Sequence, residues 1–249
     1  MKIITIINRR GGVGKTATAH AIGSGLHENG KNVLFVDLDS QNNLTFDTGA
    51  NPQAQNIFEV LTGANISGAI QKTCCGDIIP AAAALAGADV AITETGKEYK
   101  LREALEEISG NYDFCIIDTP PALGILTINA LTASDIAIIP AQAEIHSLQG
   151  IYQLNETIKA VKKYCNPKLK IFGVLITRYN SRTIISADMK ENIKRAAEDI
   201  GTKLLPTPIR ECTAIKEAQA MQTSIFKYAP KSNAAKDYTE LINAIIKEV

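Results

Sequence analysis

Residues 8–16 have the sequence Asn-Arg-Arg-Gly-Gly-Val-Gly-Lys-Thr and follow directly after an apolar run at residues 3–7. The apolar run predicts a short strand, and helix-compatible sequence resumes at Lys15. Glycines are required where backbone N–H groups curl around an anion, because a Cβ would obstruct the approach or forbid the dihedral angles. A glycine-rich turn with a chance Gly-Lys-Thr is the alternative. The strand before the segment and the helix after it favour a phosphate-binding loop.

The last residues of this loop have the chemistry that a nucleotide needs. The predicted helix directs the positive end of its dipole at the phosphates. Lys15 places a positive charge on the β- and γ-phosphates, and the Thr16 hydroxyl can ligate Mg²⁺. The loop therefore predicts a site for a nucleotide and Mg²⁺.

Two further apolar runs end in carboxylates. Residues 33–36 are followed by Asp37 and Asp39, and residues 114–117 are followed by Asp118. Ligands of open α/β sheets bind at the carboxyl ends of the strands, so we expect these acids at one edge of the sheet. An acid in this position can hold Mg²⁺. The alternative for the acids at 37 and 39 is that they cap the following helix.

The composition and the apolar runs predict an α/β fold. Of the 249 residues, 45% are hydrophobic and 21% are charged, as in ordinary globular proteins. Almost wholly apolar strands are typical of a parallel sheet covered by helices. No linker-like segment divides the chain, so we expect a single domain over residues 1–249, with a mostly parallel, helix-covered β-sheet.

The sequence pattern also places the individual elements. It predicts strands at 2–7, 32–37, 76–80, 113–118, 135–140, 170–177 and 203–206. It predicts helices at 15–29, 43–49, 56–62, 82–90, 97–109, 124–133, 147–164, 184–200, 213–222 and 233–247. Ser147 is the expected N-cap of the longest of these helices.

Charge is unevenly distributed along the chain. The net charge is zero, but residues 1–150 have 9 Lys and Arg against 16 Asp and Glu, and residues 151–249 have 17 against 10. A basic face for a polyanion and lysine-rich solvated helix faces both explain this asymmetry.

The cysteines and the apolar runs indicate the cellular compartment in which we expect the protein. The five cysteines form no C-x-x-C pair, and no histidine lies at metal-ligand spacing from them, so nothing supports a disulfide framework or a zinc site. Reduced thiols indicate a cytoplasmic protein. We see no secretory leader pattern, and no apolar run approaches the ~20 residues that span a bilayer.

The phosphate loop departs from the standard pattern G-x-x-x-x-G-K-[ST], because Arg9 stands where the first Gly is required. It resembles instead the deviant Walker A motif K-G-G-x-G-K-[ST] of the ParA/MinD group of P-loop ATPases, in the SIMIBI class. In that group the early lysine reaches across a nucleotide-sandwich dimer to the phosphates of the partner. Arg10 occupies its position, with the same charge and a different geometry. The hydroxyl residue usual after Thr16 is replaced by Ala17.

The acidic segments resemble the switches of the same group. Residues 37–41 are similar to its D-x-D-P-Q segment, with Ser40 in place of Pro, and residues 118–121 are similar to its Walker B acid and second switch. By this resemblance Asp39 orients or activates the attacking water, and Thr16, Asp37 and Asp118 support Mg²⁺. The implied catalytic residues are Lys15, Asp39 and Arg10. The implied nucleotide-binding residues are Arg10, Gly11, Gly12, Val13, Gly14, Lys15, Thr16 and Ala17, with Pro206 and Pro208 on the adenine side.

The rest of the chain is similar to the small, Soj-like ParA partition ATPases, a type without an N-terminal DNA-binding domain. The resemblance implies ATP and Mg²⁺ as cofactors, a homodimer that forms with ATP, and non-specific DNA binding by that dimer. A ParB-like centromere-binding protein then stimulates hydrolysis and releases the DNA. Arg210 matches the family arginine implicated in DNA contact, and Arg182, Lys194 and Arg195 can extend a basic face. Each single lysine is also explained as part of a solvated helix face. The segments with this similarity are residues 126–131, 139–144, 178–183 and 228–238.

A MinD-like ATPase that moves between cytoplasm and membrane is the alternative function. Such chains end in a basic amphipathic helix that lies on anionic lipid. Here the final apolar stripe, which runs from Leu241 to Ile246, has no basic cluster beside it, so we expect it to pack on the sheet and expect no membrane partner. An iron-protein relative needs paired cysteines at its cluster, which the sequence does not offer. A small-molecule synthetase is disfavoured by the similarities in the C-terminal part.

Overall fold

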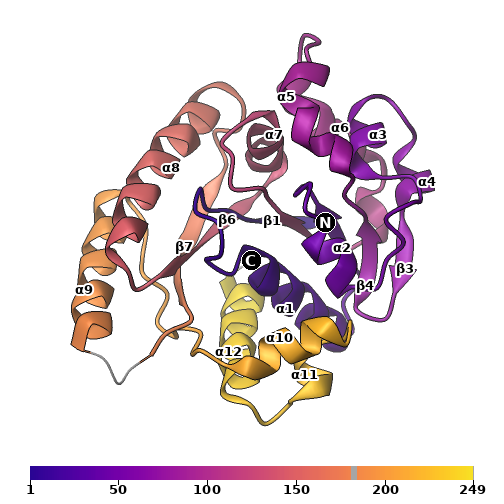
Figure 1. Cartoon of the computed structure of the whole chain (residues 1–249). Helices are drawn as coiled ribbons and strands as arrows, with labels where there is room; N and C mark the ends of the chain where they lie inside the picture. The colour runs from indigo at the N-terminus through magenta and orange to yellow at the C-terminus, as the bar shows by residue number, and fades with distance from the viewer. Residues whose placement is uncertain (181–183, 249) are drawn as a thin grey trace.

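The computed structural model describes residues 1–180 and 184–248, and residues 184–186 by their backbone alone. Its centre is a seven-stranded sheet with strand order β3-β4-β2-β5-β1-β6-β7 (Figure 1). Every neighbouring pair is parallel except β3 and β4, which form an antiparallel hairpin. The strands are β1 (Lys2–Ile6), β2 (Val33–Asp37), β3 (Gln71–Thr73), β4 (Gly76–Ile79), β5 (Phe114–Asp118), β6 (Ile136–Gln142) and β7 (Lys170–Thr177).

Helices cover both faces of this sheet. The α-helices are α1 (Lys15–Glu28), α2 (Asn43–Asp47), α3 (Ile57–Leu61), α4 (Ile66–Ala69), α5 (Ala88–Ala91), α6 (Lys100–Glu107), α7 (Ile125–Ala133), α8 (Ile145–Tyr164), α9 (Ile184–Asp199), α10 (Thr213–Ala220), α11 (Ile225–Tyr228) and α12 (Asn233–Glu248). Short 3-10 helices are η1 (Ala83–Gly87), η2 (Lys97–Tyr99) and η3 (Ser109–Asn111).

The core divides into three parts because successive strand residues point to opposite faces. Phe35 of β2 belongs to the cluster that α1 and α10–α12 cover, whereas its neighbours Leu34 and Val36 belong to the cluster under α3–α7. A third cluster joins β6 and β7 to α8 and α9. The apolar strands are thus buried on both faces, as their sequences predict. The α/β prediction is confirmed.

The structure differs from the predicted elements at several points. The run at 203–206 is no strand: only Leu204 forms an isolated bridge, to Val174 of β7. The strand β3 was not expected, because its polar sequence is half exposed and resembles a loop. Helix α8 begins before the predicted N-cap: Glu144 has the extended backbone of a cap, and Ser147 donates its N–H to the Glu144 carbonyl, so Ser147 is buried inside the first turn.

Helix boundaries elsewhere follow local capping. The predicted helix at 82–90 is divided between η1 and α5, and the one at 97–109 includes η2, α6 and η3. Two short helices were missed: α4 is capped by Asn65 and α11 by Ser224. Most of the apolar stripe of α12 packs inward as expected: Leu241, Ile242 and Ile245 are buried in the cluster that includes α1, whereas Ile246 is 41% exposed.

His20 lies on the buried face of α1, and burial lowers its pKa from 6.5 to about 4. Its Nε2 has no hydrogen-bond partner among the described residues. The surrounding side chains include the ring of Phe35, the amide of Gln219 and the hydroxyl of Tyr238, none of which is charged between pH 4 and 7. Gln219 in turn donates a hydrogen bond to the carboxylate of Asp47.

We expect His20 to make the fold sensitive to acid. Its stabilising contribution is complete above the unfolded pKa of 6.5 and declines as the pH falls towards 4, where the loss amounts to about 3 kcal/mol. The pKa of Asp47 is raised to about 6 by burial, so its protonation acts in the opposite direction. Urea unfolding of His20→Leu should therefore lack this decline, whereas His27→Leu, an exposed control, should keep it. Equal pH profiles for wild type and His20→Leu would contradict the prediction.

Candidate nucleotide-binding site

The phosphate loop leaves the end of β1 and enters α1, as its sequence predicts. Gly12 and Gly14 have φ angles of 75° and 86°, in the left-handed region that a side chain disfavours. Asn8 holds the loop from within: its Nδ2 donates to the Pro140 carbonyl at 2.6 Å, and its Oδ1 accepts from the Arg10 N–H at 3.0 Å. The loop is thus fixed against the carboxyl end of β6.

The neighbouring strands add two more ties. Gln142 Nε2 donates to the Gly12 carbonyl at 2.8 Å, and Thr177 Oγ1 donates to the Val13 carbonyl at 2.7 Å. Because these loop carbonyls are bonded to the protein, the loop conformation is set before any ligand is present. Preorganised N–H donors of this kind cost little reorganisation on binding an anion.

Lys15 is the cation at the centre of the loop. Its side chain is buried, and Nζ donates to the Arg10 carbonyl at 3.1 Å. Burial lowers its pKa, while the nearby carboxylates of Asp118 and Asp39 raise it. The ammonium therefore lies between the loop and the acidic strand ends, where the β- and γ-phosphates are expected.

The three predicted acids meet at the ends of β2 and β5. Asp37 lies opposite Asp118 in the strand register. Both carboxylates are fully buried, and this burial raises the pKa of Asp37 to about 6 and that of Asp118 well above its ordinary value. The charge of Asp37 raises the pKa of Asp118 further. The buried acids thus form a cluster of carboxylates beside the single ammonium of Lys15, whose charge opposes the rise in the pKa of Asp118.

The contacts of Asp118 fit a hydrated Mg²⁺ ion. Thr16 Oγ1 donates to Asp118 Oδ2 at 2.6 Å, and Asp118 Oδ1 is buried with no partner among the described residues. A hydroxyl, an unpartnered carboxylate oxygen and nearby acids are the hard oxygen donors that Mg²⁺ prefers. Asp37 differs, because Oδ2 accepts from both the N–H and the hydroxyl of Thr45, at 2.8 Å each, and Oδ1 accepts from the Asp39 N–H. Its oxygens are already engaged in positioning α2 and Asp39.

Asp39 faces the cavity beside the loop. It is 9% exposed, and its Oδ1 accepts from the Gln41 N–H at 3.1 Å. This bond fixes the carboxylate at the start of the segment that leads into α2. Its place at the carboxyl end of β2 is the one that the switch-like sequence predicts.

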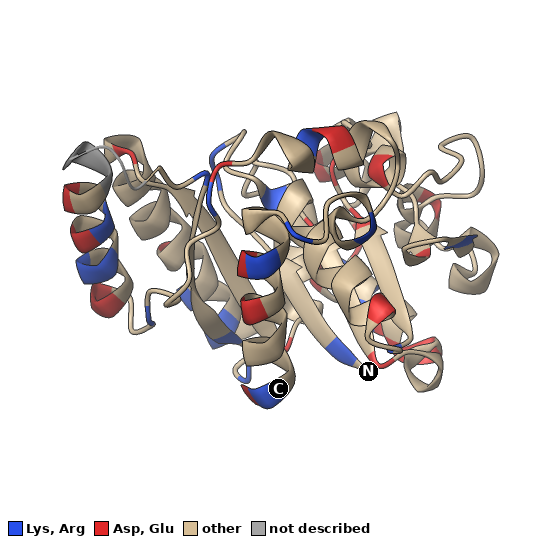
Figure 2. Cartoon of the chain, turned by 90° about the horizontal axis from the view of Figure 1, so that it is seen from below, with Lys and Arg blue, Asp and Glu red and all other residues tan. Residues whose placement is uncertain are grey.

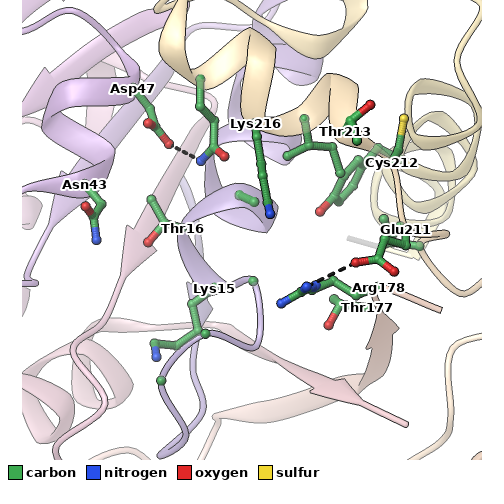
Figure 3. Close-up of a pocket in the computed structure, with 18 of the residues that line it drawn as sticks. Lys15, Thr16, Asn43, Asp47, Thr177, Arg178, Glu211, Cys212, Thr213 and Lys216 are labelled. Atoms are coloured by element: carbon green, nitrogen blue, oxygen red, sulfur yellow. Dashed lines mark hydrogen bonds and ion pairs between the residues drawn. The ribbon is translucent and has the colours of Figure 1, made fainter. Parts of the chain in front are cut away.

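A cavity of about 670 Å³ extends from the loop to the far side of α1 (Figure 3). Its volume lies within the range of nucleotide-sized pockets. The ion pair of Arg178 and Glu211, at 3.1 Å, borders one side, and the hydrogen bond of Gln219 to Asp47, at 2.5 Å, borders the other. Lys216 reaches into the cavity from α10. The lining residues include Gly11, Gly12, Gly14, Lys15, Thr16, Ala17, Asp39, Gln41, Pro121, Thr177, Arg178, Ile209, Arg210, Glu211, Cys212, Thr213 and Lys216.

The two prolines predicted on the adenine side lie next to the cavity lining in sequence rather than within it. Pro206 and Pro208 are not among the residues that line the cavity, whereas residues 209–213 are. The loop runs beside β7, where Leu205 donates its N–H to the Val174 carbonyl and Ile209 donates to the Ile176 carbonyl. The chain turns toward the cavity only after this second bond. Sequence similarity located the loop but not its inward-facing residues.

Arg10 contacts its own chain in this structure. Its Nη2 lies 2.5 Å from Oε2 of Glu144, which caps α8. Its Nη1 is buried and has no partner among the described residues. The guanidinium therefore has a free donor at the loop, on the side of α8.

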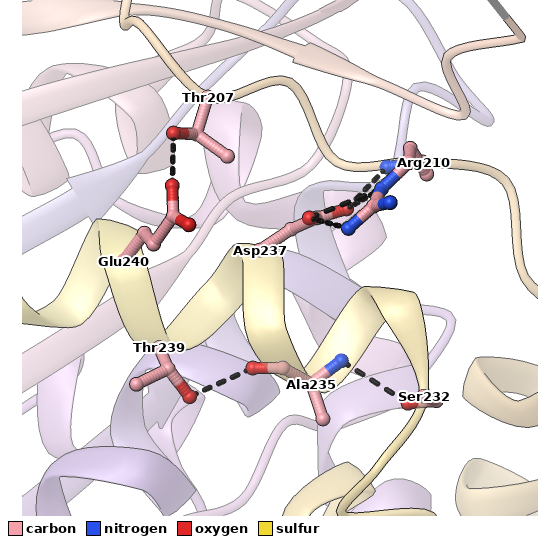
Figure 4. A network of polar contacts seen from close by, with 7 residues as sticks. All are labelled: Thr207, Arg210, Ser232, Ala235, Asp237, Thr239 and Glu240. Atoms are coloured by element: carbon pink, nitrogen blue, oxygen red, sulfur yellow. Dashed lines mark hydrogen bonds and ion pairs between the residues drawn. The ribbon is translucent and has the colours of Figure 1, made fainter.

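The predicted DNA-binding residues are scattered. Arg210 forks onto the buried carboxylate of Asp237 in α12, with Nη2 at 2.5 Å from Oδ1 and Nε at 3.0 Å from Oδ2 (Figure 4). Arg182 lies outside the described residues. Lys194 and Arg195 are exposed on α9, where Arg195 is 3.8 Å from Glu191.

The charge on α9 is mixed. Basic and acidic residues alternate along the helix, at the left of Figure 2. Its acidic residues are Asp188, Glu191, Glu198 and Asp199, against Lys190, Lys194 and Arg195. The described part of α9 thus has no uniformly basic face, and the charge of Arg210 is compensated within the chain.

Known proteins place this site in a family. A family model described as "AAA domain" matches residues 1–171. The sporulation initiation inhibitor protein Soj of Bacillus subtilis is 40% identical over 98% of both chains. The chromosome partitioning protein ParA of Caulobacter vibrioides is 33% identical over 99% of this chain and 94% of its own. The chain belongs to the ParA/Soj family of P-loop partition ATPases.

Solved structures agree with this ParA/Soj assignment. A Cyanothece McdA in complex with ATP superposes with a TM-score of 0.88, at 26% identity over 98% of this chain and 96% of the other. A putative plasmid partition protein of Borrelia burgdorferi, bound to AMPPNP, has a TM-score of 0.85, at 26% identity over 100% and 99%. A cobyrinic acid a,c-diamide synthase of Mycobacterium smegmatis, with bound ADP and magnesium, has a TM-score of 0.87, at 36% identity over 99% and 94%.

A second family model, described as 4Fe-4S iron sulfur cluster binding proteins of the NifH/frxC family, matches residues 123–249 of this ParA-family chain. That half contains Cys165, near Tyr99, and Cys212, in the nucleotide cavity. They lie on different elements, and the described residues include no group of three or more Cys, His, Asp or Glu that could hold a metal. These residues do not fit an iron–sulfur cluster.

In the part of the chain that the structure describes, no helix is long and apolar enough to cross a bilayer.

Proposed function

We propose that this chain is a Mg²⁺-dependent ATPase that distributes DNA, with a nucleotide-sandwich dimer as its DNA-binding state. The observation that supports it most directly is the assembly of Lys15, Thr16 and Asp118, where one buried carboxylate oxygen has no partner among the described residues. The family membership supports partition as the cellular role. A slow basal rate, stimulation by a ParB-like protein and a cytoplasmic, nucleoid-associated location complete the proposal.

The residues of the site have separate roles in ATP hydrolysis. The loop N–H groups and Lys15 bind the β- and γ-phosphates and stabilise the charge that develops on them. Bound Mg²⁺ supplies further electrostatic stabilisation at these phosphates, and Thr16 and Asp118 are the residues that hold it. Asp39 orients the attacking water and accepts its proton. Asp37 keeps α2 in position through the bonds that it accepts from Thr45, and it keeps Asp39 in position by accepting the Asp39 N–H.

ATP-dependent DNA binding tests the proposal. We expect gel shifts of unrelated duplexes with ATP and none with Lys15→Ala. Affinity should fall steeply with salt, because phosphate contacts release counterions. Lys194→Ala and Arg195→Ala should each weaken binding and lower the salt slope by about one. Equal binding with and without ATP, and in Lys15→Ala, would contradict a nucleotide-switched DNA-binding protein.

A second prediction concerns Arg10 and the dimer. Light scattering should show a monomer without nucleotide and a dimer with ATP. Arg10→Ala should raise the dimer dissociation constant at least tenfold, or about 1.4 kcal/mol, because the variant lacks the charge-assisted contacts with the partner's phosphates. In the wild type the guanidinium leaves Glu144 to make those contacts. Arg10→Lys should restore part of the affinity, since it keeps the charge. Arg9→Ala is the matched control, because Arg9 contacts Gln153 outside the cavity. A monomer under all conditions would exclude the sandwich mechanism.

The neighbouring structure of a diamide synthase raises small-molecule amidation as a second candidate. This candidate predicts ATP hydrolysis that depends on an acid substrate and an amide donor, and no ATP-dependent binding to DNA. The gel-shift experiment therefore separates the two functions. A MinD-like role is not favoured, because Leu241, Ile242 and Ile245 of α12 are buried rather than available to lipid.

A further inference from the structure

The turn between β3 and β4 brings two thiols together. Cys74 and Cys75 occupy the two positions between Thr73 and Gly76, which pair across the hairpin. Successive side chains in a strand point to opposite faces, so adjacent cysteines ordinarily hold their sulfurs apart. Here the two Sγ atoms are 3.7 Å from one another. The turn therefore overrides the alternation and places both sulfurs on one side.

The surrounding contacts fix this arrangement. Thr73 Oγ1 donates to the Gly76 carbonyl at 2.6 Å and accepts from the Cys75 N–H at 3.2 Å. Gly76 has φ 128°, and a Cβ there would lie 3.1 Å from the Val33 carbonyl oxygen. The backbone of the turn is thus held by a side chain on one side and by β2 on the other.

The two thiols have different environments. Cys74 is exposed, and its Sγ lies 3.9 Å from the Gln222 carbonyl. Cys75 is 1% exposed and packs in the core cluster beneath α1. Burial, with the neighbouring thiol, raises the pKa of Cys75 to about 12, and the Lys227 ammonium nearby opposes this shift. A ligand that arrives from solvent therefore binds Cys74 first, and Cys75 then completes the chelate.

The distance between the sulfurs distinguishes two kinds of chemistry. A disulfide needs an S–S length of about 2.05 Å, which would require the turn to contract. Two thiolates bound to one centre at about 2.3 Å lie about 3.3 Å apart when the bonds are at right angles, as in a pyramidal centre, and about 3.8 Å apart when the centre is tetrahedral. The free thiols are 3.7 Å apart, in S–H···S contact, which lies within this span. The turn is thus arranged to bridge a third atom rather than to form a direct bond.

The number of donors limits what that atom can be. Zinc sites need four ligands, and the described residues contain no group of three or more Cys, His, Asp or Glu in metal-binding proximity. Soft thiolates select thiophilic centres. We propose that Cys74 and Cys75 form a binding site for a thiophilic centre that needs only two thiolates, such as a monosubstituted trivalent arsenical.

The reaction with phenylarsine oxide balances without an oxidant. Two As–S bonds form and the As=O bond breaks, while the two thiol protons combine with the oxide oxygen and leave as water. Arsenic stays trivalent. This site is separate from the ATPase cycle, so its test is independent of the proposed function.

Intact-mass spectrometry with phenylarsine oxide tests the site. One equivalent should bind per chain, and peptide mapping should show Cys74 and Cys75 as the two thiols of the five that are protected from alkylation. An excess of a dithiol should remove the arsenical, and the same excess of a monothiol should not, because only a dithiol matches the chelate. Cys74→Ser should lose this monothiol-resistant binding, and Cys165→Ser should keep it.

A thermal melt tests whether the fold preorganises the pair. A ligand that binds the folded chain better than the unfolded chain raises the melting temperature. Adjacent cysteines can also chelate arsenic in an unfolded chain, and that binding does not raise the melting temperature. A melting temperature that rises with phenylarsine oxide in wild type and does not rise in Cys74→Ser would therefore support a site formed by the folded turn. Binding that resists a monothiol in Cys74→Ser, or a melting temperature that falls on binding, would overturn the proposal. Cys74 is exposed, so the serine variant is expected to fold.

Discussion

Replacing Lys15 with alanine is expected to lower kcat for ATP hydrolysis at least a hundredfold and to weaken nucleotide binding. The ammonium is buried at the loop, 3.1 Å from the Arg10 carbonyl, and it faces Asp118 and Asp39. Its removal leaves those carboxylates opposite the incoming phosphates with no compensating charge. Losing one preorganised electrostatic contact of this kind costs about 10²–10³ in kcat. Steady-state phosphate release and the binding of a fluorescent ATP analogue measure the two effects.

Lys216→Ala is the matched control for this loss of charge. Lys216 lines the same cavity from α10, and it has no ion pair among the described residues. If the site needs only positive charge somewhere in the cavity, both alanine variants should lose activity equally. We expect instead that Lys216→Ala changes KM severalfold and leaves kcat within about threefold, because its ammonium enters the cavity from α10 (Figure 3), whereas the ammonium of Lys15 acts directly on Asp118. Activity of Lys15→Ala within tenfold of wild type would refute the assignment.

The sequence predicted those parts of the site that are local in the chain. The glycines before Lys15 and the apolar runs before Asp37 and Asp118 are contiguous patterns. A parallel sheet then brings the ends of its strands to one edge, so the meeting of Asp37 and Asp118 followed from topology alone. For this reason the P-loop, the acids and the α/β class were all predictable.

The far wall of the cavity was not predictable in the same way. Arg178 and Glu211 are 33 residues apart and meet only because residues 209–211 run beside β7. Gln219 and Asp47 are separated by 172 residues. Such contacts depend on how α10 and α2 pack over α1, and no local pattern encodes that packing. Similarity to a family gave the loop at 206–210 and left its inward-facing residues undetermined.

The role of Arg210 shows a similar limit. Its match to the family arginine predicted DNA contact, but no local pattern indicated that Asp237, 27 residues later, accepts hydrogen bonds from its guanidinium. The structure shows a fork onto a carboxylate that is 4% exposed at the side chain. Arg210 therefore connects the loop at the cavity to α12. A DNA phosphate would have to compete with Asp237 for its guanidinium.

Asp39→Ala is expected to separate ATP binding from ATP hydrolysis. Asp39 lines the cavity, and its carboxylate accepts a hydrogen bond from the Gln41 N–H but, among the described residues, none from the phosphate loop. Its removal should leave nucleotide affinity within a few-fold, while the single-turnover rate falls by 10²–10⁴, roughly the contribution of a general base. The variant should therefore accumulate as the ATP-bound dimer.

Asp37→Asn distinguishes this effect from simple damage to the switch segment. Asp37 accepts hydrogen bonds from the N–H and the hydroxyl of Thr45. An asparagine at position 37 should therefore hold α2 less firmly, and should lower both the free energy of unfolding and the affinity for nucleotide. Asp39→Ala, by contrast, should melt at the wild-type temperature and bind DNA persistently with ATP. A single-turnover rate near that of wild type would move the activation of water to another group. Loss of ATP binding in Asp39→Ala would show instead that this carboxylate organises the site, because a residue that acts only on water does not contribute to the affinity for the ground state.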